Sequence, residues 1–138
     1  KQPADWDRLK AMAVMQDMLT ANLDIDIVYV HNEDMAAGVV QVLKESNKLN
    51  NPIKVVSNNG SPEGIEMIKD GDLLATCANS PSYEGAVAAI TIYDYLNGKK
   101  IPEKVSTPLS VNTKETVDEI NTWEIDTAIR AMNEHLNK

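Results

Sequence analysis

Phenylalanine is absent from the 138 residues, and aromatic side chains together make up only 4% of the chain. Aliphatic residues must therefore build most of the hydrophobic core, and each of the few aromatic residues becomes informative. Acidic residues outnumber basic ones, which gives a formal net charge of −8, and no run of lysine or arginine occurs. The sequence therefore predicts neither a nucleic-acid partner nor binding to an anionic membrane surface.

Cysteine occurs once, at Cys77, so no disulfide framework can be predicted. Cys77 lies inside an apolar run, where a single thiol is typical of a small buried hydrophobic residue. No stretch approaches the roughly 20 apolar residues of a membrane helix, and no secretory signal opens the chain. The first residues, Lys1 to Asp5, look like a loop entered from an upstream segment, so we expect a fragment or a cleaved chain.

Short apolar runs alternate with helical patterns through most of the chain. The runs cover residues 25–30, 53–57 and 73–78, and the helical patterns cover residues 7–19, 36–47, 62–69 and 82–96. Successive strand–helix units predict an α/β fold with a doubly wound parallel sheet, right-handed crossovers and helices on both faces. Residues 105–111 contain Pro108, which restricts them to an edge strand or a crossing segment. Thr113 is expected to cap a short helix, and residues 124–136 form a final amphipathic helix.

Asparagine recurs where three of these apolar runs end, at Asn32, at Asn58 and Asn59, and at Asn79. The carboxyl ends of parallel strands share one edge of a sheet, which is where open α/β sheets bind ligands. An amide both donates and accepts hydrogen bonds, so such a cluster suits an uncharged, polyhydroxylated ligand. Each asparagine also has a purely local explanation, because Asn32 can cap a helix and the others have turn chemistry.

Trp6 lies just before the first helical pattern, where a large aromatic residue has no periodic role. It can pack on that helix, or it can offer its indole face to the C–H face of a sugar ring. Trp123, between two predicted C-terminal helices, is expected to be a packing residue.

Residue patterns for catalysis are missing. His31 and His135 are far apart in the predicted fold, and the serines lack a G-x-S-x-G elbow. No glycine-rich phosphate loop follows a predicted strand, and no pair of carboxylates can be singled out. We therefore predict no catalytic residue, no metal ligand and no cofactor.

Four segments together resemble the periplasmic sugar-binding proteins of the ribose and glucose/galactose type, which are related to the effector domains of LacI-type repressors. They are QPADWDRLKAMAVMQDML, HNEDMAAG, SNNGSPEGIEMIKDG and ATCANSPSYEGAVAA. The resemblance implies the C-terminal half of a two-lobe protein whose lobes close on a sugar around a hinge. It assigns residues 1–79 to the C-terminal lobe, residues 80–109 to a crossing packed on the N-terminal lobe, and residues 110–138 to a return onto the C-terminal lobe.

By the same resemblance, Trp6 stacks on the sugar and Asn32 and Asn79 bind its hydroxyl groups. Asn59 stands where the family commonly has aspartate, and an amide accepts fewer hydrogen bonds than a carboxylate. This departure argues against plain ribose or glucose and leaves room for another pentose, a hexose, a polyol or a furanone-like signal.

The function implied is a non-catalytic receptor that delivers a small neutral sugar or polyol to an ABC transporter permease. The expected location is periplasmic or extracytoplasmic, with a lipid anchor in a Gram-positive cell. One alternative is the effector domain of a LacI-type repressor, which would need an upstream helix-turn-helix. Another is a doubly wound enzyme whose catalytic residues lie in the absent half.

Overall fold

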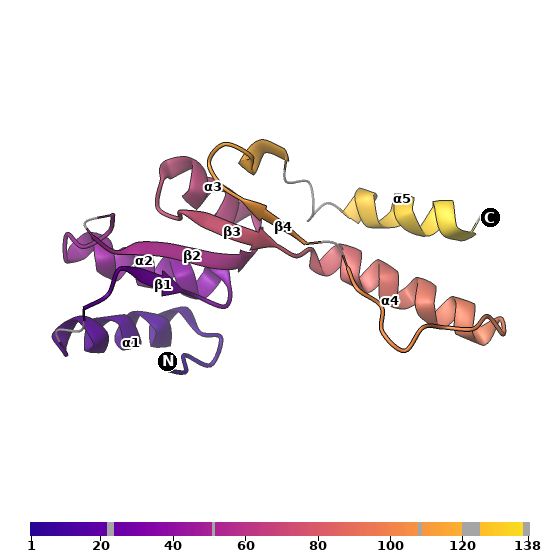
Figure 1. Ribbon diagram of the computed structural model, residues 1–138, viewed down its shortest axis with the longest axis horizontal. Helices are drawn as coiled ribbons and strands as arrows, with labels where there is room; N and C mark the ends of the chain where they lie inside the picture. Colours follow the sequence, from indigo (N-terminus) through magenta and orange to yellow (C-terminus); the bar gives the residue numbers. More distant parts are fainter. Residues whose placement is uncertain (22–23, 51, 108, 120–124, 137–138) are drawn as a thin grey trace.

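The computed structural model describes residues 1–138 except 22–23, 51, 108, 120–124 and 137–138 (Figure 1). In chain order, its elements are α1 (Arg8–Thr20), β1 (Ile27–Tyr29), α2 (Glu33–Glu45), β2 (Lys54–Asn59), α3 (Pro62–Asp70), β3 (Ala75–Ala78), α4 (Pro81–Leu96), β4 (Ser110–Asn112), the 3₁₀ helix η1 (Val117–Glu119) and α5 (Ile125–Leu136). The predicted alternation of strands and helices is confirmed.

The sheet has the strand order β1-β2-β3-β4. The first three strands are parallel, with Tyr29 opposite Val56 and Val56 opposite Ala75. β4 runs antiparallel to β3, with Val111 opposite Cys77. The open, mainly parallel α/β sheet is therefore confirmed, and β4 is the edge strand expected near Pro108.

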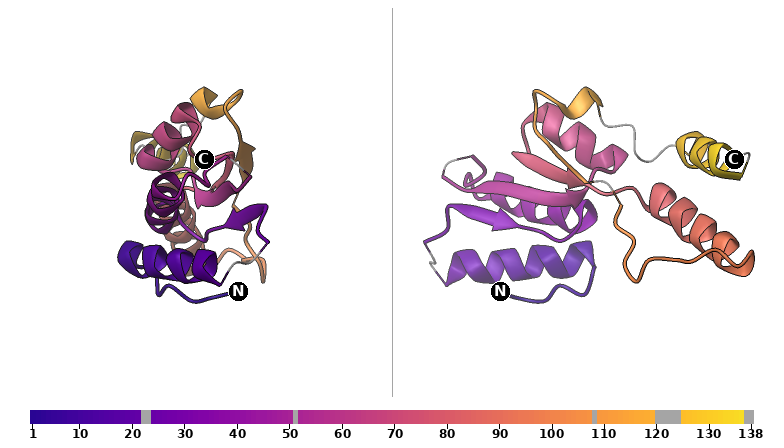
Figure 2. Two further views of the ribbon diagram at one scale, coloured as in Figure 1. Left: turned by 90° about the vertical axis from the view of Figure 1, so that its left-hand side faces the viewer. Right: turned by 45° about the vertical axis from the view of Figure 1, so that its right-hand side comes forward.

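The helices α1, α2 and α3 lie on one face of the sheet (Figure 2, left). α2 contacts both α1 and α3. Because β1, β2 and β3 follow one another in a single direction, right-handed crossovers place their connecting helices on the same side. The described residues thus differ from the expectation of helices on both faces. The other face carries the exposed side chains of Ile27, Tyr29 and Val111.

The hydrophobic core lies between the sheet and these three helices. α2 buries residues at the i, i+3, i+4, i+7 spacing that faces one side of a helix, namely Ala36, Val39, Val40 and Leu43. They pack with Met15 of α1, Val55 of β2 and Ile68 of α3, each at most 1% exposed. Aliphatic and methionine side chains therefore build this core, as the lack of phenylalanine predicted.

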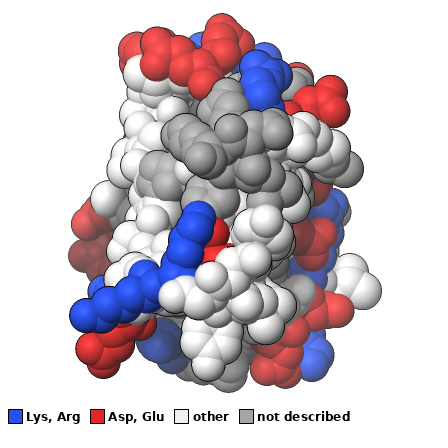
Figure 3. Space-filling model, turned by 90° about the vertical axis from the view of Figure 1, so that its right-hand side faces the viewer, with Lys and Arg blue, Asp and Glu red and all other residues white. Residues whose placement is uncertain are grey.

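The helices α4 and α5 pack against each other and extend away from the sheet (Figure 1). β4 lies in the sheet and η1 contacts α3. The assignment of residues 1–79, 80–109 and 110–138 to the two lobes stays a prediction of the resemblance. Exposed apolar side chains line α4, namely Ile92, Tyr93, Tyr95 and Leu96. Figure 3, which faces this end of the molecule, shows uncharged surface between scattered charged groups.

Local signals set the helix ends. Ser61 and Ser80 cap α3 and α4, each helix begins with proline, and α3 ends at Gly71 with φ of +82°. Thr113 was expected to cap a short helix, and a turn followed by the short 3₁₀ helix η1 comes after it. The hydroxyl group of Thr113 donates to the Glu115 carboxylate, which lowers the pKa of Glu115. Trp123 and the side chain of His135 lie outside the described residues.

Candidate functional site

The carboxyl ends of β2 and β3 bring two of the predicted site residues together. The backbone N–H of Asn79 donates to the carbonyl oxygen of Asn59 at 2.9 Å. Asn59 is also opposite Ala78 in the sheet register, so Asn79 directly follows the last paired residue. The sequence predicted that these asparagines share one sheet edge, and the structure confirms this placement.

Asn32 follows β1 and is the N-cap of α2. Its side-chain Oδ1 accepts a hydrogen bond from the backbone N–H of Met35 at 2.8 Å. The capping explanation for Asn32 is thus confirmed, and the acceptor end of its amide is occupied. The donor end, Nδ2, is the part of this side chain that suits a ligand acceptor.

Asn58 and Asn59 form a pair at the end of β2. The Nδ2 of Asn58 donates to the Oδ1 of Asn59 at 2.8 Å. Asn59 has a φ of +120°, in the region where residues other than glycine are uncommon, and Gly60 follows with φ of +72°. The turn chemistry of Asn-Asn-Gly therefore reverses the chain direction here, and it presents the Asn59 amide at the sheet edge.

Asn79 lies where the chain leaves the sheet for α4. Its side-chain Oδ1 is buried and has no hydrogen-bond partner among the described residues. An unpaired buried acceptor costs about 1–3 kcal/mol. A hydroxyl group brought by a ligand or by another segment would remove that cost if the side chain turned toward it.

Trp6 stands in a tight turn in front of α1. The N–H of Asp7 donates to the carbonyl oxygen of Ala4 at 2.9 Å, and the two residues between them have positive φ, +48° at Asp5 and +61° at Trp6. Positive φ is a genuine strain for a bulky residue. Trp6 is 67% exposed, and its indole meets His31 edge to face, with ring centroids 6.2 Å apart. The turn therefore presents the indole to solvent.

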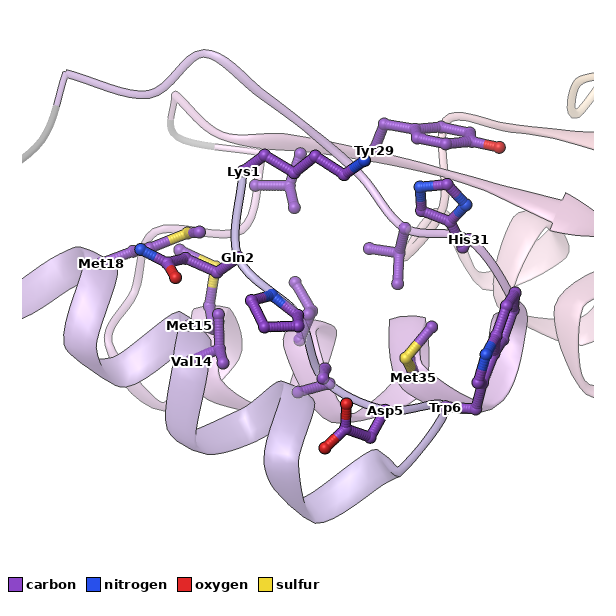
Figure 4. A pocket seen from close by; sticks show the side chains of 16 residues that line it. Lys1, Gln2, Asp5, Trp6, Val14, Met15, Met18, Tyr29, His31 and Met35 are labelled. Carbon is purple, nitrogen blue, oxygen red and sulfur yellow. The ribbon is translucent and has the colours of Figure 1, made fainter.

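A cavity of about 610 Å³ opens between the segment before α1 and β1 (Figure 4). Trp6 and His31 stand at its rim, while Met15, Val30 and Val39 supply apolar walls. Among the predicted site residues, this cavity contacts Trp6 but none of the three asparagines. Its mainly apolar lining does not suit a polyhydroxylated ligand, so the amide edge is the better candidate for such a ligand.

Glu33, the first residue of α2, is 2% exposed and accepts hydrogen bonds from the turn after β2 and from β3. Its Oε1 accepts from the N–H of Gly60 at 2.8 Å and from the hydroxyl group of Thr76 at 2.6 Å, and its Oε2 accepts from the N–H of Ser61 at 2.6 Å. No pattern in the sequence singles out this residue. A glutamate beside an N-cap has an adequate local explanation, and its partners lie 27 to 43 positions away.

Two acidic residues at the neighbouring helix starts share one arginine as their partner. Arg8 of α1 pairs with Asp34 of α2 at 2.8 Å and with Glu63 of α3 at 2.7 Å. The hydrogen bond to Glu63 is the largest cause of a raised pKa at Arg8, and the bond to Asp34 adds to it. No group of three histidine, cysteine or acidic side chains within the described residues could hold a metal ion. No helix in the described part is long and apolar enough to cross a membrane.

Comparison with known proteins links this chain to sugar-binding receptors. Residues 1–100 match the family model described as a periplasmic binding protein domain. The ribose import binding protein of Bacillus subtilis is 36% identical over 115 residues, which cover 83% of this chain and 37% of that protein. The chain thus spans well under half the length of this relative.

Two solved structures show the same arrangement. The arabinose-transporter binding protein of Shewanella sp. ANA-3, bound to L-arabinofuranose, superposes with a TM-score of 0.75 at 32% identity over 99% of this chain and 45% of its own. The Actinobacillus succinogenes solute-binding protein with bound D-allose superposes with a TM-score of 0.79 at 28% identity, covering 86% of this chain and 42% of its own. The fold is therefore that of part of a sugar-binding receptor.

Proposed function

We propose, from the premise that this chain belongs to the periplasmic binding protein domain family, that it is the C-terminal half of a solute-binding protein for a small neutral sugar or polyol. The observation that carries the proposal is the neutral edge where three strands end, with amides from Asn32, Asn59 and Asn79. Amides can pair with hydroxyl groups in either direction, which fits sugars and not anions. The related proteins named for ribose and arabinose, and the one with bound D-allose, support the same class of ligand.

Each site residue has a distinct role in this proposal. Trp6 stacks on the apolar face of the sugar ring, and its exposed, strained turn supports that role. Asn32 donates through Nδ2, because its Oδ1 is held by the helix cap. Asn79 accepts from a hydroxyl group through its unpartnered Oδ1. Asn59 replaces a carboxylate with an amide and so selects among neutral sugars.

The second lobe would pack on the unit formed by α4 and α5. Their departure from the sheet and the exposed apolar residues Ile92, Tyr95 and Leu96 support this, because large apolar patches mark interaction surfaces. The crossings Asn79–Pro81 and Val111–Thr113 would serve as hinge segments, since the first directly follows the last paired residue of β3 and the second contains the end of β4. Ligand contact with both lobes would then favour the closed state.

The complete protein would act without catalysis, in the periplasm or outside the cell membrane, and would deliver the sugar to an ABC transporter permease. In a Gram-positive cell it would carry a lipid anchor. The related proteins are import binding proteins and solute-binding proteins. They favour neither the repressor effector domain nor the enzyme that the sequence left as alternatives.

The stacking role of Trp6 can be tested in the full-length protein. We expect Trp6→Ala to weaken sugar binding at least tenfold, which corresponds to about 1.4 kcal/mol, whereas Trp6→Phe keeps an aromatic face and most of the affinity. Isothermal titration calorimetry with D-ribose, D-allose, L-arabinose and myo-inositol measures both. Unchanged affinity in a folded Trp6→Ala protein would disprove the stacking assignment, and a wild-type protein that binds no sugar or polyol would disprove the function.

A further inference from the structure

We propose that Glu33 is a positioning residue that sets the spacing of the sugar-binding amides, an inference that rests on the proposed function. Glu33 is a buried carboxylate, and it makes no salt bridge within the described residues. Burying a charge is costly unless hydrogen bonds satisfy it. Here three donors do so, and they come from two different segments of the chain.

The partners of Glu33 lie next to the predicted ligand contacts. Asn32 immediately precedes Glu33, and Gly60 and Ser61 immediately follow Asn59. Thr76, which is 1% exposed, lies in β3 three residues before Asn79. One carboxylate therefore ties together the ends of all three strands that carry the amides.

Backbone hydrogen bonds extend this connection. The N–H of Asn79 donates to the carbonyl oxygen of Asn59 at 2.9 Å, so a movement of the turn after β2 also reaches β3. Asn59 already has an unfavourable φ of +120°. A residue in a strained conformation persists only when its surroundings hold it there. Glu33 supplies that constraint by accepting hydrogen bonds from the backbone N–H groups of Gly60 and Ser61, the two residues that follow Asn59.

Both carboxylate oxygens are needed. Oε1 accepts two hydrogen bonds and Oε2 accepts the third, from Ser61 at 2.6 Å. A glutamine has nearly the same shape but only one acceptor oxygen. With that oxygen facing Gly60 and Thr76, the amide nitrogen would face the N–H of Ser61, and two donors cannot bond each other. The turn must then shift, and Asn59 shifts with it.

The first test is Glu33→Gln in the full-length protein. We expect the Kd for the best-bound sugar among D-ribose, D-allose, L-arabinose and myo-inositol to rise at least tenfold by calorimetry. Val42→Ala is the matched control, because Val42 is 3% exposed on α2 but nine residues farther along the helix. It should lower the melting temperature and leave the Kd within twofold of wild type. Equal affinity losses in both variants would reduce Glu33 to an ordinary core residue and overturn the proposal.

The second test removes the hydrogen bond that the Thr76 hydroxyl group donates to Glu33. Thr76→Val removes the hydroxyl donor and should weaken binding severalfold, whereas Thr76→Ser keeps the donor and should bind like wild type. Loss of affinity in the serine variant equal to that in the valine variant would contradict a role for the hydrogen bond.

A third measurement does not depend on any ligand. Amide hydrogen exchange at Gly60 and Ser61, read by NMR, should be slow in the wild type and much faster in Glu33→Gln. Unchanged exchange at both amides would overturn the positioning role. A wild-type protein that binds none of the four probes would defeat the proposed function, and the exchange rates would still decide what Glu33 does.

Discussion

Gly64, in the first turn of α3, leaves the space that the buried carboxylate of Glu33 occupies. A Cβ atom added at Gly64 would lie 2.2 Å from Cδ of Glu33 and 2.4 Å from its Oε1. These separations are too short for any real contact. Gly64→Ala therefore has to displace the carboxylate, even though the helix itself would accept alanine readily.

The cost follows from the bonds that displacement breaks. A hydrogen bond to a charged group contributes about 1.5–3 kcal/mol, and Glu33 accepts three of them. Loss of two gives about 3–6 kcal/mol. Alanine has a helix propensity up to about 1 kcal/mol better than glycine. We expect Gly64→Ala to lower the free energy of unfolding of the sheet and its three packed helices by about 2–5 kcal/mol.

A double-mutant cycle separates the clash from other effects of the substitution. Urea unfolding of the full-length protein, followed by circular dichroism, gives the free energies for wild type, Gly64→Ala, Glu33→Ala and the double variant. In the Glu33→Ala background the obstructing atoms are gone, so Gly64→Ala should cost nothing or stabilise slightly. The same large cost in both backgrounds would refute the reasoning.

Two further predictions concern single hydrogen-bonding groups. Asn59→Asp supplies an acceptor with two charged oxygens, so affinity for ribose or allose should rise about tenfold by calorimetry. Weaker binding of every sugar tested would contradict the role given to Asn59. The hydroxyl group of Thr113 lowers the pKa of Glu115. The hydrogen bond therefore contributes to the stability of the folded protein above the ordinary carboxylate pKa, and this contribution is lost as the pH falls through the lowered pKa. Thr113→Val should raise that pKa toward its ordinary value in a carbon-13 NMR titration, and an unchanged pKa would exclude the hydroxyl group as its cause.

The order of strands and helices could be predicted from the sequence because strong local signals set it. Ser61-Pro62 and Ser80-Pro81 start helices through capping and a preset backbone angle, and Gly71 stops one. The side of the sheet on which the helices pack could not be predicted in the same way, because it depends on strand order. Strand order follows from long-range pairing, for which no residue in a single sequence gives a local signal.

The site was predictable to the extent that it depends on strand ends. Asn32, Asn59 and Asn79 were assigned to one edge because each follows an apolar run, and parallel strands end together. Glu33 was missed because hydrogen bonds from Gly60 and Thr76 reach it only after folding. The capping interaction of Asn32 was expected from the sequence, and it directs Oδ1 toward the N–H of Met35.

The chain has a net charge of −8, yet the acidic residues that start α2 and α3 already have partners beside the proposed ligand edge. Arg8 pairs with Asp34 and Glu63 at the starts of α2 and α3. Glu33 is buried, and its carboxylate accepts hydrogen bonds from the backbone N–H groups of Gly60 and Ser61 beside this edge. In the proposed function, the amides of Asn32, Asn59 and Asn79 would be the groups that meet the ligand. An anionic ligand would find no positive charge to offset its desolvation, whereas a neutral sugar would lose only hydrogen bonds that the amides can replace.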